Sequence, residues 1–266
     1  MVLTNSIFGI KHIVILFISF AAIVLGVVFG KKLKLQTALR ILLIIGIVSE
    51  SIKVIYYILT NENSVAYTYA GEDVMFDGYL PKTDLPFHLC SIQLIFILIL
   101  NITKDEKIRK LLFSFMLPTC LIGGAAALFL ATSSSLNGLW ILSFQYFGFH
   151  AGIVWFAILL LVSKEVKFEI KDYRNCLFML FATLFIAIYL NSWINDYVHD
   201  INFMYVVNPP MSGLPYLNKN HGWGVYIAHY AFLCIFAVTM IYIKPIIDSI
   251  KNRKNKNLVS ETAAVQ

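Results

Sequence analysis

Charged residues are scarce in this chain. Only 14% of its 266 residues are charged and 59% are hydrophobic, whereas a soluble domain of this size carries about a quarter charged residues. The longest polar stretch, roughly 195–221, is of loop length, so no separate soluble domain fits beside the apolar sequence. A soluble enzyme is therefore excluded. The net charge of +6 does not indicate a nucleic-acid partner, because the basic residues fall at the ends of apolar runs.

Cysteine is also sparse, and its spacing contains no disulfide or zinc motif. The four cysteines are Cys90, Cys120, Cys176 and Cys234. Each belongs to a different apolar run and none forms a C-x-x-C pair, so neither a disulfide framework nor a zinc ribbon is supported. We expect no metal and no cofactor. The default role of a free cysteine in such a run is that of a small hydrophobic residue.

Long apolar runs dominate the sequence instead. Each is long enough to cross a hydrocarbon core of about 30 Å with about 20 helical residues. They cover roughly 10–29, 38–59, 85–102, 111–131, 142–162, 175–194 and 223–243. We predict an all-α, polytopic membrane protein in which residues 1–250 form a seven-transmembrane-helix bundle. Residues 251–266 are polar and lack periodicity, which predicts a disordered cytoplasmic tail.

The basic residues predict the orientation of this bundle. Most of the 21 lysines and arginines follow the first, third, fifth and seventh runs, whereas the loop before the third run is acidic. Loops rich in lysine and arginine face the cytoplasm. The N-terminus is therefore predicted outside and the C-terminus in the cytoplasm.

Polar residues inside the apolar runs gather toward the predicted outer side. Counted by depth, Glu50 and Lys53 fall in the outer half of the second run and Asn191 in the outer part of the sixth. All six histidines are placed on the same side: His12, His88, His150, His199, His221 and His229. Ionisable residues within a membrane are functional candidates, so we predict a polar pocket that opens outward. Glu50 and Lys53 could instead form a structural ion pair, and Asn191 could simply connect helices.

Cys90 is the one cysteine near this outer pocket. It falls in the first turns of the predicted third helix, where the helix dipole favours a thiolate. A thiolate beside an imidazole is the nucleophile and base pair of acyl transfer. His88 points about 200° away around the helix, so we expect the base from another helix, His150 first and His229 second. Backbone amides at the helix start, or Gln93, could supply oxyanion donors.

Two motifs resemble a known family. The stretch Leu85-Pro86-Phe87-His88-Leu89-Cys90, after an acidic outer loop, is similar to the L-P-[LF]-H-L-C signature of the YwaF-like integral membrane family. The stretch Asn202-Phe203-Met204-Tyr205, followed by Pro209 and Pro210, resembles that family's N-Y-M-x segment, with Phe203 in place of the usual tyrosine. The resemblance would cover nearly all of the chain, although only the first motif is specific.

Eukaryotic relatives of this family are regarded as transmembrane lipid acyltransferases with a cysteine in the first motif. The resemblance therefore implies Cys90 as the nucleophile and His150 as its partner. It also implies membrane lipids as partners, among them an acyl-donor phospholipid, and a bacterial cell membrane as the location. The residues expected to line the pocket are His88, Gln93, Glu50, Lys53, Asn191, Asn202, Tyr205 and His229.

Other classes of membrane protein stay open. A thiol-dependent lipid hydrolase would use the same cysteine. The odd-numbered helices each have a histidine near the outer end, as in a transporter built from parallel repeats, which would bind a small polar or anionic solute. Three histidines could also hold the zinc of a membrane hydrolase, although His229 lacks a second histidine one turn away. The sequence does not predict an oligomeric state.

Overall fold

The chain is mainly helical in the computed structural model. The model describes residues 7–60, 65–69, 72–76, Leu85, 87–131, Leu136, 139–163, 166–195, 201–209 and 217–252. Within these ranges, six helices are long and apolar enough to span a membrane. They are α1 (Ile10–Gly30), α2 (Leu35–Thr60), the continuous helix of α4 (Glu106–Pro118), η2 (Thr119–Gly123) and α5 (Gly124–Phe129), α7 (Trp140–Val162), α8 (Ile170–Asn195) and α9 (Trp223–Ile241). Multi-pass membrane architecture is therefore shown.

The third predicted span differs from the prediction of seven full-length helices. Among the described residues of that span, Ile92–Ile102 is the helical part, as α3. Its 11 residues rise about 16 Å at 1.5 Å per residue, too short for a core of about 30 Å. Residues 87–91 form a turn instead, in which the N–H of Gln93 bonds the carbonyl of Cys90 at 3.2 Å. Hydropathy could not reveal this break, because a turn covered by protein can have the same composition as a helix.

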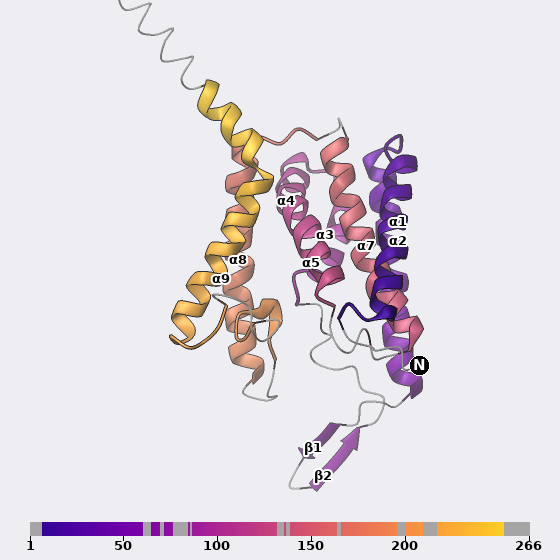
Figure 1. The fold of residues 1–266 in the computed structure, drawn as a ribbon. Helices are drawn as coiled ribbons and strands as arrows, with labels where there is room; N and C mark the ends of the chain where they lie inside the picture. Colours follow the sequence, from indigo (N-terminus) through magenta and orange to yellow (C-terminus); the bar gives the residue numbers. More distant parts are fainter. Residues whose placement is uncertain are drawn as a thin grey trace, which may run out of the picture.

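A small antiparallel hairpin between α2 and α3 also departs from the all-α prediction. β1 (Val65–Tyr69) pairs with β2 (Glu72–Phe76), with Val65 opposite Phe76. Figure 1 shows it beyond the end of α2, at what we call the hairpin end of the bundle. The β-branched and aromatic residues of β1 favour a strand. A hairpin outside the helical bundle is free of the rule that restricts spanning segments to helices and closed barrels.

The opposite end of the bundle holds the basic residues, and we call it the basic end. α1 begins at the hairpin end and α9 finishes at the basic end (Figure 1). The described part of the chain therefore begins and ends at opposite ends of the bundle. Which side faces the cytoplasm stays a prediction. Of the predicted tail, residues 251 and 252 are helical and the rest lies outside the described residues.

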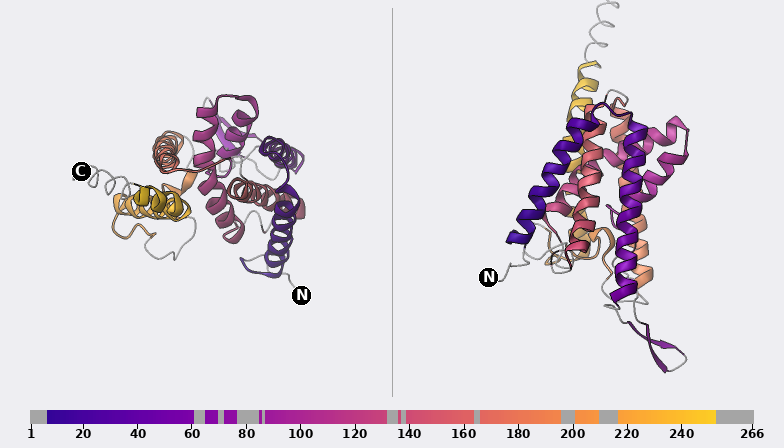
Figure 2. Two further views of the ribbon diagram at one scale, coloured as in Figure 1. Left: turned by 90° about the horizontal axis from the view of Figure 1, so that it is seen from above. Right: turned by 90° about the vertical axis from the view of Figure 1, so that its right-hand side faces the viewer.

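α7 is the central helix of the bundle. It contacts α1, α2, α4, η2 and α5, and the views in Figure 2 place α1 and α2 on one side of it and α8 and α9 on the other. Most of its residues from Phe147 to Leu160 are buried. A helix that is hydrophobic all round belongs in the interior, and this position places His150 inside the protein.

A close helix contact lies beside His150. A Cβ on Gly124 of α5 would lie 2.7 Å from Cγ2 of Val154 and 3.3 Å from the carbonyl oxygen of His150. A Cβ on the preceding Gly123 would meet only Leu89, at an ordinary 3.5 Å. Gly124 therefore lets α5 approach α7 at the level of the histidine.

We expect Gly124→Ala to lower the free energy of unfolding by about 1–3 kcal/mol, because the added methyl overpacks the contact between α5 and α7. Gly123→Ala is the matched control, and it should be neutral or stabilising because alanine is the better helix former. Thermal unfolding of the detergent-purified variants measures both. Equal melting temperatures for the two variants would contradict the assignment of Gly124 to the close contact.

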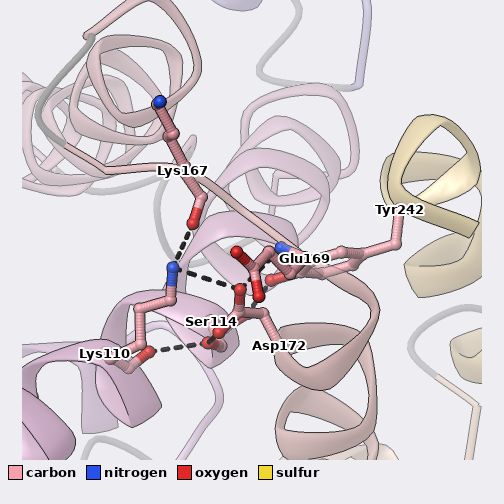
Figure 3. Close-up of polar contacts among 6 residues, drawn as sticks. All are labelled: Lys110, Ser114, Lys167, Glu169, Asp172 and Tyr242. Carbon is pink, nitrogen blue, oxygen red and sulfur yellow. Dashed lines mark hydrogen bonds and ion pairs between the residues drawn. The ribbon is translucent and has the colours of Figure 1, made fainter. Parts of the chain in front are cut away.

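A buried polar cluster joins three helices at the basic end (Figure 3). Asp172 of α8 is 2% exposed, and its carboxylate lies 3.1 Å from both the Ser114 hydroxyl and the Lys110 ammonium of α4. The N–H of Glu169 donates to it at 2.7 Å. The hydroxyl of Tyr242, directly after α9, donates to the carbonyl of Ser114 at 2.8 Å. Because the carboxylate has several partners, it can be buried here, and it ties α4 to α8.

Candidate functional site

Cys90 lies in the turn that precedes α3, half-buried. The imidazole of His150 lies close enough to its thiol for the two groups to interact electrostatically. The Ser91 hydroxyl and the N–H of Cys90 itself also face the sulfur. Burial opposes ionisation of the thiol, whereas the imidazole and these donors favour the thiolate. The break in the third span therefore puts the cysteine at a helix start, beside a histidine of the central helix.

His150 is 4% exposed on α7, and its two ring nitrogens have different roles. Nδ1 lies 2.7 Å from the carbonyl oxygen of Tyr146. Since a carbonyl only accepts, Nδ1 must bear the hydrogen, and the neutral ring then has its lone pair on Nε2. Nε2 has no well-aligned partner among the described residues, so its contact with the thiol is loose. Catalytic hydrogen bonds are often loose before substrate binds, and Nε2 is the atom able to take a proton from Cys90.

Tyr146 is a site residue that the sequence analysis missed. Its ring centroid lies 4.2 Å from that of His150, and its hydroxyl donates to the carbonyl of Ala127 at 3.1 Å. Its phenol also interacts electrostatically with Cys90 and Tyr205. Its position one turn before His150 is the signal that could have identified it, since residues four apart share a helix face.

The two sequence motifs pack against each other. The ring of His88 lies 5.5 Å from that of Phe203 and 5.6 Å from that of Tyr205. Phe87 makes an edge contact with Phe203 at 5.3 Å. Tyr205 comes close enough to Cys90 for the two groups to interact electrostatically. The segment before α9 thus forms one wall of the cysteine site.

Two asparagines hold this segment. Asn191 of α8 is 1% exposed. Its oxygen accepts from the N–H of Phe203 at 2.8 Å, and its amide donates to the carbonyls of Phe203 and Ala187. The oxygen of Asn202 accepts from the N–H groups of Val207 and Asn208. Asn191 and Asn202 were both predicted to line the pocket. In the described contacts, their side chains instead hold the backbone of the segment before α9 in place.

The segment contains two consecutive non-glycine residues in the left-handed region. Met204 has φ 53° and Tyr205 has φ 56°, a conformation that costs roughly 1–2 kcal/mol per residue. The Tyr226 hydroxyl of α9 donates to the carbonyl of Tyr205, and the Trp223 indole donates to that of Val206 at 2.8 Å. Burial raises the pKa of the Tyr205 phenol, and the nearby Cys90 raises it further. Strain of this kind persists only where surrounding structure imposes it, and it is concentrated at functional sites.

Gln93 differs from its predicted role as an oxyanion donor. Its amide nitrogen donates to the carbonyl of Leu89 and to the hydroxyl oxygen of Thr119, both at 3.0 Å. The Thr119 hydroxyl gives its own hydrogen to the carbonyl of Phe115 at 2.7 Å, so it can only accept from Gln93. Both N–H groups are engaged, and the unpartnered atom among the described residues is the buried oxygen Oε1. An oxyanion donor must come from elsewhere.

Glu50 and Lys53 form an ion pair along α2. The ammonium of Lys53 lies 2.8 Å from a carboxylate oxygen of Glu50, with the side chains 12% and 33% exposed respectively. Each charge is balanced by the other within one helix, as in an i, i+3 pair. This geometry favours the structural role that the sequence left open.

The histidines that the structure describes do not form one outward pocket. His229 is exposed on α9, so it is not a buried wall of the cysteine site. His12 is fully buried and accepts from the N–H of Phe8, while its other nitrogen donates to the carbonyl of Leu128 at 2.8 Å. His12 therefore ties α1 to α5. His221 is exposed, and His199 lies outside the described residues.

The described residues of this site do not provide a set of ligands for a metal ion. Within the ranges that the structure describes, no group of three or more histidine, cysteine, aspartate or glutamate side chains is placed to hold a metal ion.

An apolar groove of about 320 Å³ lies between α1, α2 and α7, and Gly148, Gly152 and Trp155 line its α7 side. Gly148 and Gly152 lie two residues on either side of His150, about 200° around the helix. The α7 residues that line the groove are thus centred on another face of the helix than His150.

The family of the chain follows from comparison with known proteins. The TMEM164 family model matches residues 7–242, a range that includes both motifs and the spanning helices. No curated protein and no solved structure matches the chain. The match supports a membrane protein family of the TMEM164 type, and it does not support the YwaF-like assignment specifically. Because the match covers most of the sequence, the chain belongs to the TMEM164 family of multi-pass membrane proteins.

Proposed function

We propose that this protein is a membrane-embedded lipid acyltransferase in which Cys90 is the nucleophile and His150 is the general base. One observation carries the proposal. The buried imidazole of His150 donates through Nδ1 to Tyr146, which leaves the lone pair of Nε2 for the Cys90 thiol. A nucleophile, a base and a group that orients the base are the recognisable parts of covalent acyl transfer. Here a backbone carbonyl takes the orienting role.

The chemistry needs only these groups and an ester. Nε2 of His150 takes the thiol proton as the sulfur attacks the ester carbonyl of a phospholipid. The tetrahedral intermediate collapses, the bond to the glycerol oxygen breaks, and His150 returns the proton to that oxygen. The products are a lysophospholipid and a thioester on Cys90. An acceptor hydroxyl or amine then attacks the thioester, gives its proton to Nε2, and releases the sulfur, which is reprotonated.

The position of the pair favours lipids as substrates. His150 lies within the spanning helix α7 and Cys90 lies beside it, so we expect reactants to reach the site from the membrane. Exclusion of water protects a thioester from hydrolysis. Should water reach the same intermediate, the protein would be a thiol-dependent lipid hydrolase, with the same residues in the same roles.

The transporter alternative has less support. It depended on equivalent histidines in the odd-numbered helices, but His12 is a buried tether and His229 is exposed. Residues in such different environments do not indicate a repeated binding element.

The test is a trapped acyl-enzyme. Detergent-purified protein is incubated with a phospholipid whose acyl chain has an alkyne label, and the label is located by mass spectrometry. We expect hydroxylamine-sensitive label on Cys90, and none on Cys90→Ser. Cys234→Ser, which changes a half-buried cysteine on α9, is the matched control and should label normally. Equal labelling of Cys90→Ser and the unsubstituted protein would overturn the proposal.

A further inference from the structure

Acyl transfer at Cys90 requires a hydrogen-bond donor that the two reacting residues do not supply. Negative charge develops on the carbonyl oxygen when the sulfur attacks, and preorganised donors at that oxygen are usually the largest catalytic contribution. Gln93 cannot serve, because both of its N–H groups are engaged. The Tyr146 hydroxyl is also engaged, since it donates to the carbonyl of Ala127.

Tyr205 is the remaining phenol beside the thiol. It interacts electrostatically with both Cys90 and Tyr146, and its ring packs on that of His88, two residues from the nucleophile. Its side chain is half-buried. Within the part of the chain that the structure describes, its hydroxyl makes no hydrogen bond, so its hydrogen is available to a substrate.

The backbone around Tyr205 is built to hold that position. Two left-handed residues in succession, Met204 and Tyr205, would relax if nothing opposed them. Asn191 of α8 fixes the nearby Phe203 by two hydrogen bonds, one to its carbonyl and one from its N–H, and Tyr226 of α9 fixes the Tyr205 carbonyl. Preorganised donors are the ones that stabilise a developing charge at little reorganisation cost. The strained turn is explained if its purpose is to aim the phenol.

We propose that the Tyr205 hydroxyl donates a hydrogen bond to the oxyanion formed when Cys90 attacks an acyl carbonyl. This inference rests on the proposed acyltransferase function. When the carbon–sulfur bond forms, the π electrons of the carbonyl move to its oxygen, and the thiol proton moves to Nε2 of His150. The phenol keeps its proton and donates it in a hydrogen bond to that oxygen. When the intermediate collapses, the electrons return and the bond to the leaving oxygen breaks.

The test compares two reactions of the same thiol in the Tyr205→Phe variant. Acylation by the labelled phospholipid passes through an oxyanion, whereas alkylation by iodoacetamide displaces iodide at a saturated carbon and does not. We expect acylation to slow by about 10²–10³-fold and alkylation to be unchanged, because phenylalanine keeps the ring that packs on His88. Tyr189→Phe, on an exposed face of α8, is the matched control and should change neither rate.

Each outcome decides one of the two proposals. An unchanged acylation rate in Tyr205→Phe would overturn the oxyanion role. Equal slowing of acylation and alkylation would also overturn it, because the residue would then act on the thiol or on the fold. If the unsubstituted protein is alkylated at Cys90 but never acylated, the acyltransferase function fails, and the oxyanion role fails with it.

Discussion

His150→Gln is expected to slow acyl transfer by about 10²–10⁴-fold, the usual contribution of a general base. Glutamine can still donate to the Tyr146 carbonyl, but it has no group basic enough to take the proton of the thiol. Alkylation of Cys90 by iodoacetamide should slow as well, since thiolate forms less readily, which distinguishes this variant from Tyr205→Phe. The measurements are the rates of acylation and alkylation, with the melting temperature as a check on folding.

His12→Gln is the matched control for this result. His12 is also buried, but both of its nitrogens bond to backbone groups of Phe8 and Leu128. We expect its replacement to lower the melting temperature and to leave the rate per folded molecule close to normal. Equal rates for His150→Gln and the unsubstituted protein would exclude His150 as the base.

Asn191→Leu is expected to abolish most activity by releasing the strained turn. The leucine would leave the buried N–H of Phe203 without its partner, at a cost of about 1–3 kcal/mol, and the carbonyl of Phe203 would keep only the long bond from the N–H of Val206. Met204 and Tyr205 could then relax from their left-handed conformations, and the phenol would leave its place beside Cys90. Acylation by labelled phospholipid and thermal unfolding measure the two effects.

Thr183→Val is the control on the same helix. Thr183 is similarly buried, but its hydroxyl bonds only the carbonyls of Met179 and Leu180 within α8. Loss of the Thr183 hydroxyl leaves every hydrogen bond of the segment before α9 in place, so acylation should persist. If Asn191→Leu keeps full acylation, the turn is not required for positioning Tyr205.

Hydropathy and charge alone were enough for the class of protein and the approximate spans. These properties depend on composition over about 20 residues, so they can be read without knowing any tertiary contact. The spacing of Glu50 and Lys53 predicted their possible ion pair for the same reason, because both residues lie on one helix. The first motif indicated Cys90 as a candidate, but the helical phase that set His88 aside does not apply, because residues 87–91 form a turn.

The tertiary structure decided which donors and acceptors remain free. Depth along a helix can be counted from the sequence, but the partner of a side chain depends on neighbouring helices. Thr119 on the helix that continues from α4 engages Gln93, the backbone of the segment before α9 engages Asn191, and His12 is fixed by α5. None of these partners is local in sequence. The turn before α3 packs against the rings of Phe203 and Tyr205, and the strained turn at Tyr205 is held by hydrogen bonds from Asn191 and Tyr226. Both conformations therefore depend on elements far away along the chain.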